Sequence, residues 1–189
     1  MSMIGHNRGP SMAAGFGFRK LSWSKARAEL LPTLPLEVVR LRVARAKRLG
    51  LPYKTYAQVR AASGRDIVAF LFSSNALDLR HGRSDIPYDQ AVRLADLPAT
   101  RLAAVYAPKA PDVVLGANAG LLDTAGVAPG FTATWRQTRD GLRDLARAGA
   151  VPLDGVVVVA ATAIEREWSG TAGLASTVSA DQFFAHAAD

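Results

Sequence analysis

Six side chains of the kinds that bind nucleic acid fall within residues 42–60 of this 189-residue chain. Three are arginines spaced three residues apart, and a lysine, a glutamine and a fourth arginine follow them: Arg42, Arg45, Arg48, Lys54, Gln58 and Arg60. Arginine and lysine neutralise phosphates, whereas side-chain amides read base edges. Gathered on one surface, the six would form a nucleic-acid-binding site in which the first three arginines contact the phosphate backbone.

Two helices that meet at Gly50 would have to position these side chains. The first is expected over residues 36–49, with an apolar stripe on one side and the three arginines on the other. That stripe consists of Leu36, Val39, Val43 and Ala46. Pro52 suits the first turn of a second helix, which is expected to end near Ala62. This is the layout of a helix–turn–helix, although two helices packed on a sheet around a glycine turn show the same pattern.

Charge is unevenly distributed along the chain. Residues 1–65 contain 13 Lys and Arg against two acidic residues, a net charge of +11. Residues 66–189 contain 10 against 14, a net charge of −4, and the two parts together give +7. The asymmetry predicts an anionic partner, either nucleic acid or an acidic protein, and the second would make the chain an adaptor. Alternatively, the basic face docks on the acidic part of its own chain.

A second group of polar residues follows the predicted strands. Continuous apolar runs predict buried strands at 67–72 and 156–160, and a short strand is expected at 113–115. The polar residues that come next are Ser74, Asn75, Asn118 and Thr162. Open parallel sheets bind nucleotides beyond the carboxyl ends of their strands. These residues would then line the ligand pocket of a small Rossmann-like nucleotide-binding protein or enzyme, which is the alternative to a nucleic-acid-binding protein. No glycine-rich phosphate-binding motif follows any of the strands, and the same residues also form ordinary turns and caps.

Helical segments between the apolar runs predict an α/β fold, with a small, mostly parallel sheet flanked by helices and a basic helical N-terminal region. Residues 1–20 lack periodicity and are expected to form a flexible basic arm. Residues 21–189 are expected to form a single domain, with the basic helices over 21–65 and the sheet over 66–189. Trp135 and Trp168 are expected to belong to its core.

Composition excludes several kinds of chemistry. The chain has no cysteine, which excludes disulfides, thiolate metal sites and cysteine nucleophiles. His6, His81 and His186 have no partner at metal-ligand spacing and no catalytic motif occurs, so no metal, cofactor or catalytic residue is expected. No apolar run approaches the ~20 residues that cross a bilayer, and no secretory signal is present, so a cytoplasmic protein is expected. We therefore expect a binding or regulatory protein rather than an enzyme.

Two stretches resemble those of other proteins. The first, residues 4–10 with the sequence IGHNRGP, resembles the I-G-H-N-x-G opening of small alphaproteobacterial proteins, several of them phage-related or DNA-associated. From Phe18 to Leu79 the chain resembles a family of alphaproteobacterial proteins that share K-T-Y-x-x-V-R-A-x-[ST]-G-R-D-[IV]-V-A-F-L-F-S-S-N. The resemblance implies a lineage and no activity.

Overall fold

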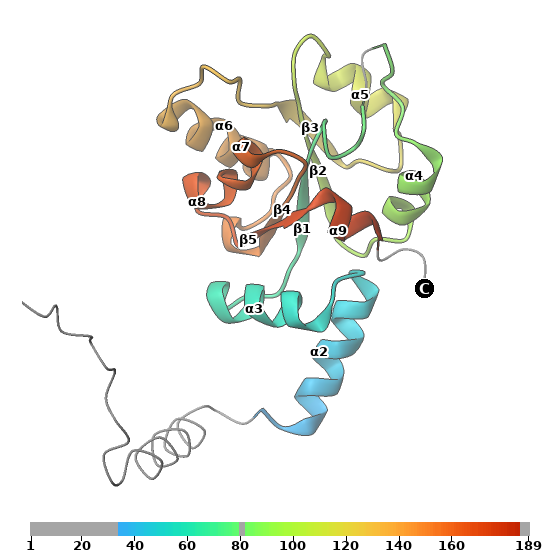
Figure 1. The fold of residues 1–189 in the computed structure, drawn as a ribbon, viewed down its shortest axis with the longest axis vertical. Helices are drawn as coiled ribbons and strands as arrows, with labels where there is room; N and C mark the ends of the chain where they lie inside the picture. The colour runs from blue at the N-terminus through green and yellow to red at the C-terminus, as the bar shows by residue number, and fades with distance from the viewer. Residues whose placement is uncertain (1–33, 80–81, 186–189) are drawn as a thin grey trace, which may run out of the picture. The chain divides into compact units, whose positions relative to one another are not determined.

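A computed structural model describes residues 34–79 and 82–185 of the chain (Figure 1). The expected N-terminal arm and all three histidines lie outside the described residues. The chain divides into two units, Met1–Val39 and Arg40–Asp189. The first four residues of helix α2 (Leu36–Arg48) belong to the first unit, and the rest of α2, the sheet and all later helices belong to the second.

Five parallel strands form one sheet in the order β3-β2-β1-β4-β5. The strands are β1 (Ala69–Ser73), β2 (Thr100–Val105), β3 (Thr124–Val127), β4 (Val156–Ala160) and β5 (Ser176–Ser179). Strands β1 and β4 are buried along their whole length, because a central strand of a parallel sheet is covered on both faces. The predicted α/β fold with a parallel sheet is confirmed.

The edge strands are the part of the sheet that the sequence does not reveal. Strands β3 and β5 have the sequences TAGV and STVS, are only partly buried and contain no continuous apolar run. The prediction of a strand at 113–115 is wrong, because helix α5 (Pro111–Ala117) occupies this stretch with Pro111 in its first turn. Asn118 therefore follows a helix and not a strand.

The strand order changes direction between β1 and β4. Strands β2 and β3 extend the sheet on one side of β1, and the chain then crosses back to place β4 on the other side. In doubly wound sheets, ligands bind beyond the carboxyl ends of the strands beside this switch point. The residues that follow β1 and β4 thus occupy the edge where a protein of this topology holds a ligand.

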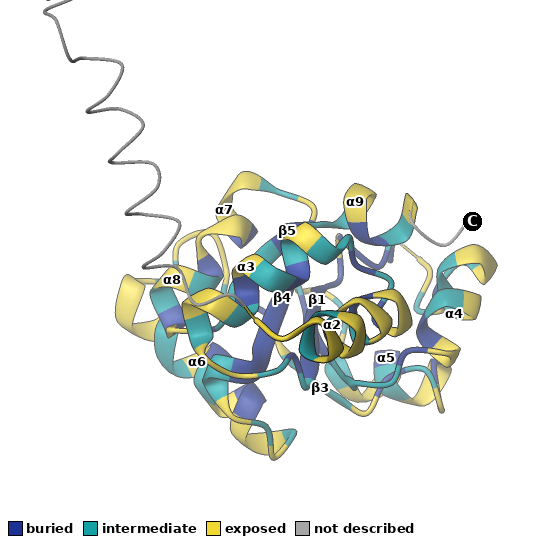
Figure 2. Cartoon of the chain, turned by 90° about the horizontal axis from the view of Figure 1, so that it is seen from below, coloured by how far each residue is buried: buried dark blue, intermediate teal, exposed yellow. Residues whose placement is uncertain are grey.

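Helices cover both faces of the sheet (Figures 1 and 2). Successive residues of β1 alternate between them, with Phe70 on one face and Leu71 on the other. The first face packs against the C-terminal part of α2, α3 (Tyr53–Ser63), α4 (Tyr88–Ala95), α5 and α9 (Ala180–Ala185). The second packs against α6 (Trp135–Ala148) and α8 (Trp168–Ala172), and α7 (Ala163–Arg166) leads from β4 into α8. None of the described helices has the length and apolarity needed to span a membrane.

The orientation of α2 differs from the predicted one. Leu36 and Val43 of the expected apolar stripe are 62% and 44% exposed. Arg42 and Arg45 are instead half-buried, on the same side of the helix as the buried Ala46. Arg45 fits such a position because its aliphatic stem packs on apolar neighbours while its head group finds polar partners. Nε of Arg42 is buried without a hydrogen-bond partner among the described residues. Two of the three arginines predicted to face phosphate are therefore turned toward the domain.

Candidate functional site

A tight turn at Gly50 joins α2 to α3. Gly50 has a φ angle of +60°, and a Cβ atom at this position would lie 1.5 Å from Nη2 of Arg93. The Arg93 guanidinium donates a 2.7 Å hydrogen bond to the carbonyl of Leu49 and lies 4.9 Å from the centre of the Phe183 ring. The turn is thus tied to α4 and α9, which fixes the orientation of the basic segment of α2.

Asp66, between α3 and β1, holds the basic helices to the start of the sheet. Its carboxylate accepts hydrogen bonds from Arg45 Nε at 3.1 Å and from the Tyr56 hydroxyl at 2.7 Å. Arg45 also donates to the carbonyls of Ile67 at 3.0 Å and Pro98 at 3.3 Å. Burial by itself raises the pKa of Asp66, but the Tyr56 hydrogen bond and the Arg45 charge outweigh it and hold this pKa below its ordinary value. The Arg45 guanidinium is therefore committed to the fold.

The six predicted nucleic-acid contacts divide into two groups. One group is half-buried and consists of Arg42, Arg45 and Arg60. Within it, Arg60 lies 3.7 Å from the Asp66 carboxylate. The other group is exposed and consists of Arg48, Lys54 and Gln58. The six residues therefore differ in how much of each side chain is exposed to a partner, and the second group is the more exposed.

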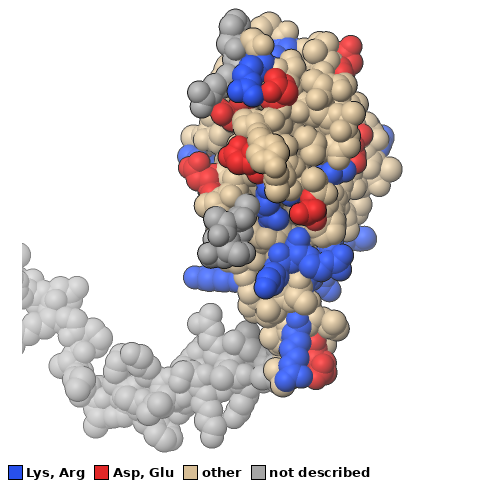
Figure 3. All heavy atoms as spheres, turned by 90° about the vertical axis from the view of Figure 1, so that its right-hand side faces the viewer, with Lys and Arg blue, Asp and Glu red and all other residues tan. Residues whose placement is uncertain are grey.

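Lys47 is an exposed cation beside this second group that the spacing of the arginines does not reveal. Its place next to Arg48 in the sequence was the available signal. No ion pair among the described residues involves Lys47, Arg48 or Lys54. Residues 40–65 contain eight Lys and Arg and no acidic residue, and Figure 3 shows Lys and Arg gathered over this part of the molecule. We define the α2–α3 surface as Lys47, Arg48, Lys54 and Gln58.

Three of the four predicted ligand residues lie together at the carboxyl ends of β1, β2 and β4. The Ser74 hydroxyl accepts a 3.2 Å hydrogen bond from the backbone N–H of Tyr106, which follows β2. The Asn75 side chain donates to the Glu165 carboxylate at 2.8 Å. Thr162 caps α7 by accepting from the backbone N–H of Glu165 at 3.3 Å. These contacts bring the three predicted residues to one edge of the sheet.

Asn118 lies apart from this group. Its side-chain amide donates to the carbonyls of Ser84 and Val114, both at 2.7 Å, and its carbonyl oxygen accepts from the N–H of Ile86 at 2.8 Å. The residue is buried, and both of its donors and its acceptor are used within the fold. Asn118 therefore fastens the segment before α4 to the end of α5.

Glu165 occupies the switch point itself. It is fully buried, and its carboxylate accepts hydrogen bonds from Asn75 and from the backbone N–H groups of Ala161 at 2.7 Å and Thr162 at 3.0 Å. Backbone N–H groups at such a strand-to-helix junction face the phosphate in nucleotide-binding sheets. Here the chain supplies the negative charge itself, which disfavours an anionic ligand beyond β4.

Tyr106 connects this carboxylate to an aromatic cluster. Its hydroxyl oxygen is buried and lies near Glu165 without meeting hydrogen-bond geometry with any described residue. Burial, and then the negative charge of Glu165, raises the pKa of Tyr106 well above its ordinary value. The Tyr106 ring is stacked on Phe131 at 5.8 Å between ring centres and lies 6.1 Å from Trp168.

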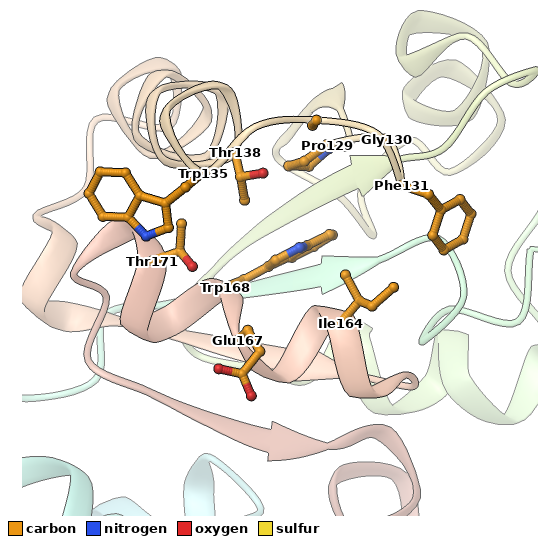
Figure 4. Close-up of a pocket in the computed structure, with 10 residues that line it drawn as sticks. Pro129, Gly130, Phe131, Trp135, Thr138, Ile164, Glu167, Trp168 and Thr171 are labelled. Carbon is orange, nitrogen blue, oxygen red and sulfur yellow. The ribbon is translucent and has the colours of Figure 1, made fainter.

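A pocket of about 140 Å³ adjoins this cluster (Figure 4). Its walls come from the β3–α6 loop, the first turn of α6 and the α7–α8 segment, and include Phe131, Trp135, Thr138, Ile164, Glu167 and Trp168. Trp168 is buried, as the sequence predicts. The expectation for Trp135 is wrong, because it is 61% exposed. It is the first residue of α6 after the cap Thr134, ahead of the stretch that packs on the sheet.

No protein-family model, curated protein or solved structure matches this chain. Within residues 34–79 and 82–185, no three acidic or histidine side chains are grouped so that they could hold a metal ion. The chemistry that the described residues offer is therefore of two kinds. One is the set of exposed cations of the α2–α3 surface, and the other is the aromatic pocket at the carboxyl edge of the sheet.

Proposed function

We propose that this chain is a non-catalytic, nucleic-acid-associated binding protein that contacts the phosphate backbone through the α2–α3 surface. The observation that carries the proposal is that Lys47, Arg48 and Lys54 are exposed cations with no ion pair among the described residues. Residues 40–65 contain no acidic side chain, so nothing within this segment offsets its positive charge. A polyanion binds such a surface by releasing condensed counterions.

Contacts to phosphate, rather than base reading, dominate this mode of binding. A recognition helix directs three or four side chains at base edges. In α3, Tyr56 and Val59 are buried, and Gln58 is the one exposed side chain that carries an amide. The helix–turn–helix-like layout thus serves to hold three cations in place, and we expect little discrimination between sequences.

The test is a salt titration of duplex binding, followed by the fluorescence anisotropy of a labelled DNA. Three phosphate contacts predict a slope of about −2.7 in log affinity against log salt, or roughly a 40-fold loss between ~50 and ~200 mM salt. The variant Lys47→Gln/Arg48→Gln/Lys54→Gln should lose roughly 100-fold in affinity at low salt, and its slope should approach zero.

The matched control removes three positive charges elsewhere. It is Arg83→Gln/Arg136→Gln/Arg147→Gln, in which each arginine is exposed and ion-paired within the fold. The two variants have the same net charge, so the control should keep its affinity within about threefold if contacts are local. Equal losses in both variants, or no binding of DNA or RNA by the native chain at low salt, would rule out the proposal.

An acidic protein would meet the same cations, and a competition experiment separates the two kinds of partner. Polyglutamate carries its charges without the regular phosphate spacing of a duplex. We expect it to compete for the labelled duplex much more weakly than unlabelled DNA at equal charge concentration. Equal competition would instead assign the α2–α3 surface to an acidic protein and make the chain an adaptor.

A further inference from the structure

The pocket beside α6 has the dimensions of a site for one small group. Its volume of about 140 Å³ is close to that of an apolar cavity of about 150 Å³ that holds a benzene molecule. Its walls come from segments that follow β3 and β4, so it opens at the carboxyl edge of the sheet. This is the edge at which sheets of this topology bind ligands.

Aromatic rings form the opposing walls of the pocket. Figure 4 shows Trp135 on one side, Phe131 on the other and Trp168 between them. Trp135 and Phe131 are 61% and 75% exposed, although large rings are normally withdrawn from water. Phe131 is nevertheless held in place by its stacking on Tyr106. Phe131 is therefore positioned before any ligand arrives.

The charged residue nearest the rings is acidic. Glu167 is the one charged residue among those that line the pocket, and it takes part in no ion pair among the described residues. Figure 4 shows its carboxylate directed away from the rings, so its charge acts on the pocket from the rim and not by direct contact. Trp135 already receives a cation on its ring, because the Arg139 guanidinium lies 5.0 Å from the ring centre. That guanidinium pairs with Asp140 at 2.8 Å, which offsets part of its positive charge. At the N-terminus of α6, the Thr134–Gln137 capping box occupies backbone donors that would otherwise face the pocket edge.

We propose that this pocket binds a small organic cation, a free molecule that carries a trimethylammonium group. The aromatic walls would contact the methyl groups through cation–π interactions, and Glu167 at the rim would add a longer-range attraction without touching the ligand. Such a group is compact enough for the volume, and its charge is spread over its methyl groups, so little hydration is lost on entry. This binding would be independent of the α2–α3 surface.

Calorimetric titration with choline, beside its uncharged isostere 3,3-dimethylbutan-1-ol, tests the proposal on the full chain. The two probes have the same shape, and only choline bears a charge. We expect choline to bind about tenfold more tightly. Equal affinity for the two probes would show an ordinary apolar pocket and overturn the proposal, as would the absence of saturable choline binding.

Two variants locate the site, each with a matched control. Trp135→Leu should weaken choline binding about tenfold, whereas Tyr88→Leu, which removes an 85% exposed ring on α4, should not change it. Glu167→Gln should weaken it about threefold and narrow the gap between choline and its isostere, whereas Asp89→Asn should do neither. Parallel losses in a variant and its control would place binding elsewhere and overturn the assignment.

A trimethylammonium group also occurs on lipids, so a vesicle experiment distinguishes the source. We expect no co-sedimentation with phosphatidylcholine vesicles, because the walls of the pocket enclose a single small group. Co-sedimentation that Trp135→Leu abolishes, in a chain that fails to bind free choline, would replace the free ligand by a lipid head group.

Discussion

Two arginine-rich regions of this molecule look alike in sequence and differ in what they offer a partner. Helix α6 carries four arginines, and all of them are engaged: Arg136 and Arg139 pair with Asp140, Arg147 with Asp144, and Arg143 donates to the Ala172 carbonyl at 2.9 Å. Over residues 40–65, eight basic residues have no acid among them. Asp66 pairs with Arg45 and Arg60, and Asp154 pairs with Arg65, whereas Lys47, Arg48 and Lys54 take part in no ion pair among the described residues. The two regions thus differ in the pairing of their charges and not in the number of arginines, and this unpaired exposed charge is the ground on which we propose a polyanion as the partner of the α2–α3 surface.

Arg45 and Arg48 give the largest contrast, because they lie three residues apart on α2 and differ in their partners. Arg45→Met should lower the free energy of unfolding by about 2 kcal/mol, since it removes the cation paired with Asp66 and the donor to two carbonyls. Arg48→Met should change it by less than about 0.5 kcal/mol and weaken duplex binding roughly fivefold. Urea unfolding and anisotropy measure the two effects, and the reverse pattern would show that Arg45 is the exposed cation.

A second experiment removes the acidic partners of the α6 arginines, so that α6, like the α2–α3 surface, carries exposed cations without ion pairs. Asp140→Asn/Asp144→Asn would release Arg136, Arg139 and Arg147 from their ion pairs. Introduced into the Lys47→Gln/Arg48→Gln/Lys54→Gln variant, the change should restore salt-dependent duplex binding by about tenfold. No gain would mean that the geometry of the α2–α3 surface matters beyond its unpaired charge.

The centre of the fold follows from the sequence because its signals are local. The runs Phe70–Phe72 and Val156–Val159 are continuous and apolar, as strands covered on both faces must be. Gly50 and Pro52 mark the end of α2 and the start of α3 within a few residues of where they occur. Edge strands carry no such signal, because one side of each faces solvent and tolerates polar residues.

The orientation of α2 could not be predicted, because it depends on residues distant in the sequence. Arg45 turns inward to meet Asp66, 21 positions later, and the carbonyl of Pro98, 53 positions later. The positions of Ser74, Asn75 and Thr162 at one edge follow from the parallel sheet, whereas the buried Glu165 that joins two of them is visible only in three dimensions. The aromatic pocket escaped prediction for the same reason, since its walls come from three separate segments.

A smaller effect is expected when an acidic side chain is introduced into α2, so that its exposed cations are ion-paired as the arginines of α6 are. Ala44 is exposed, one helical turn from both Lys47 and Arg48, so Ala44→Glu would place a carboxylate within reach of them. Duplex affinity should fall about threefold, while the helix gains ~0.3 kcal/mol from the new pairs. Ala44→Gln, which has the same size without the charge, serves as control. Equal effects of Glu and Gln would point to a steric cause.

The smallest effect is expected when the pH is lowered, and it concerns the stability that the ionised Asp66 contributes to the fold. The pKa of Asp66 is held below its ordinary value in the folded chain, so the ionised form contributes stability above about pH 4 that is lost as the pH falls through the lowered pKa. The difference in unfolding free energy between the native chain and Asp66→Asn should therefore shrink as the pH falls below about 4. In a Tyr56→Phe background the shrinkage should be weaker, because the 2.7 Å donor that favours the charged carboxylate is gone. If the difference in unfolding free energy between the native chain and Asp66→Asn stays constant across this pH range, Arg45 and Tyr56 do not favour the ionised carboxylate. Asp66 would then contribute packing and no electrostatic stabilisation.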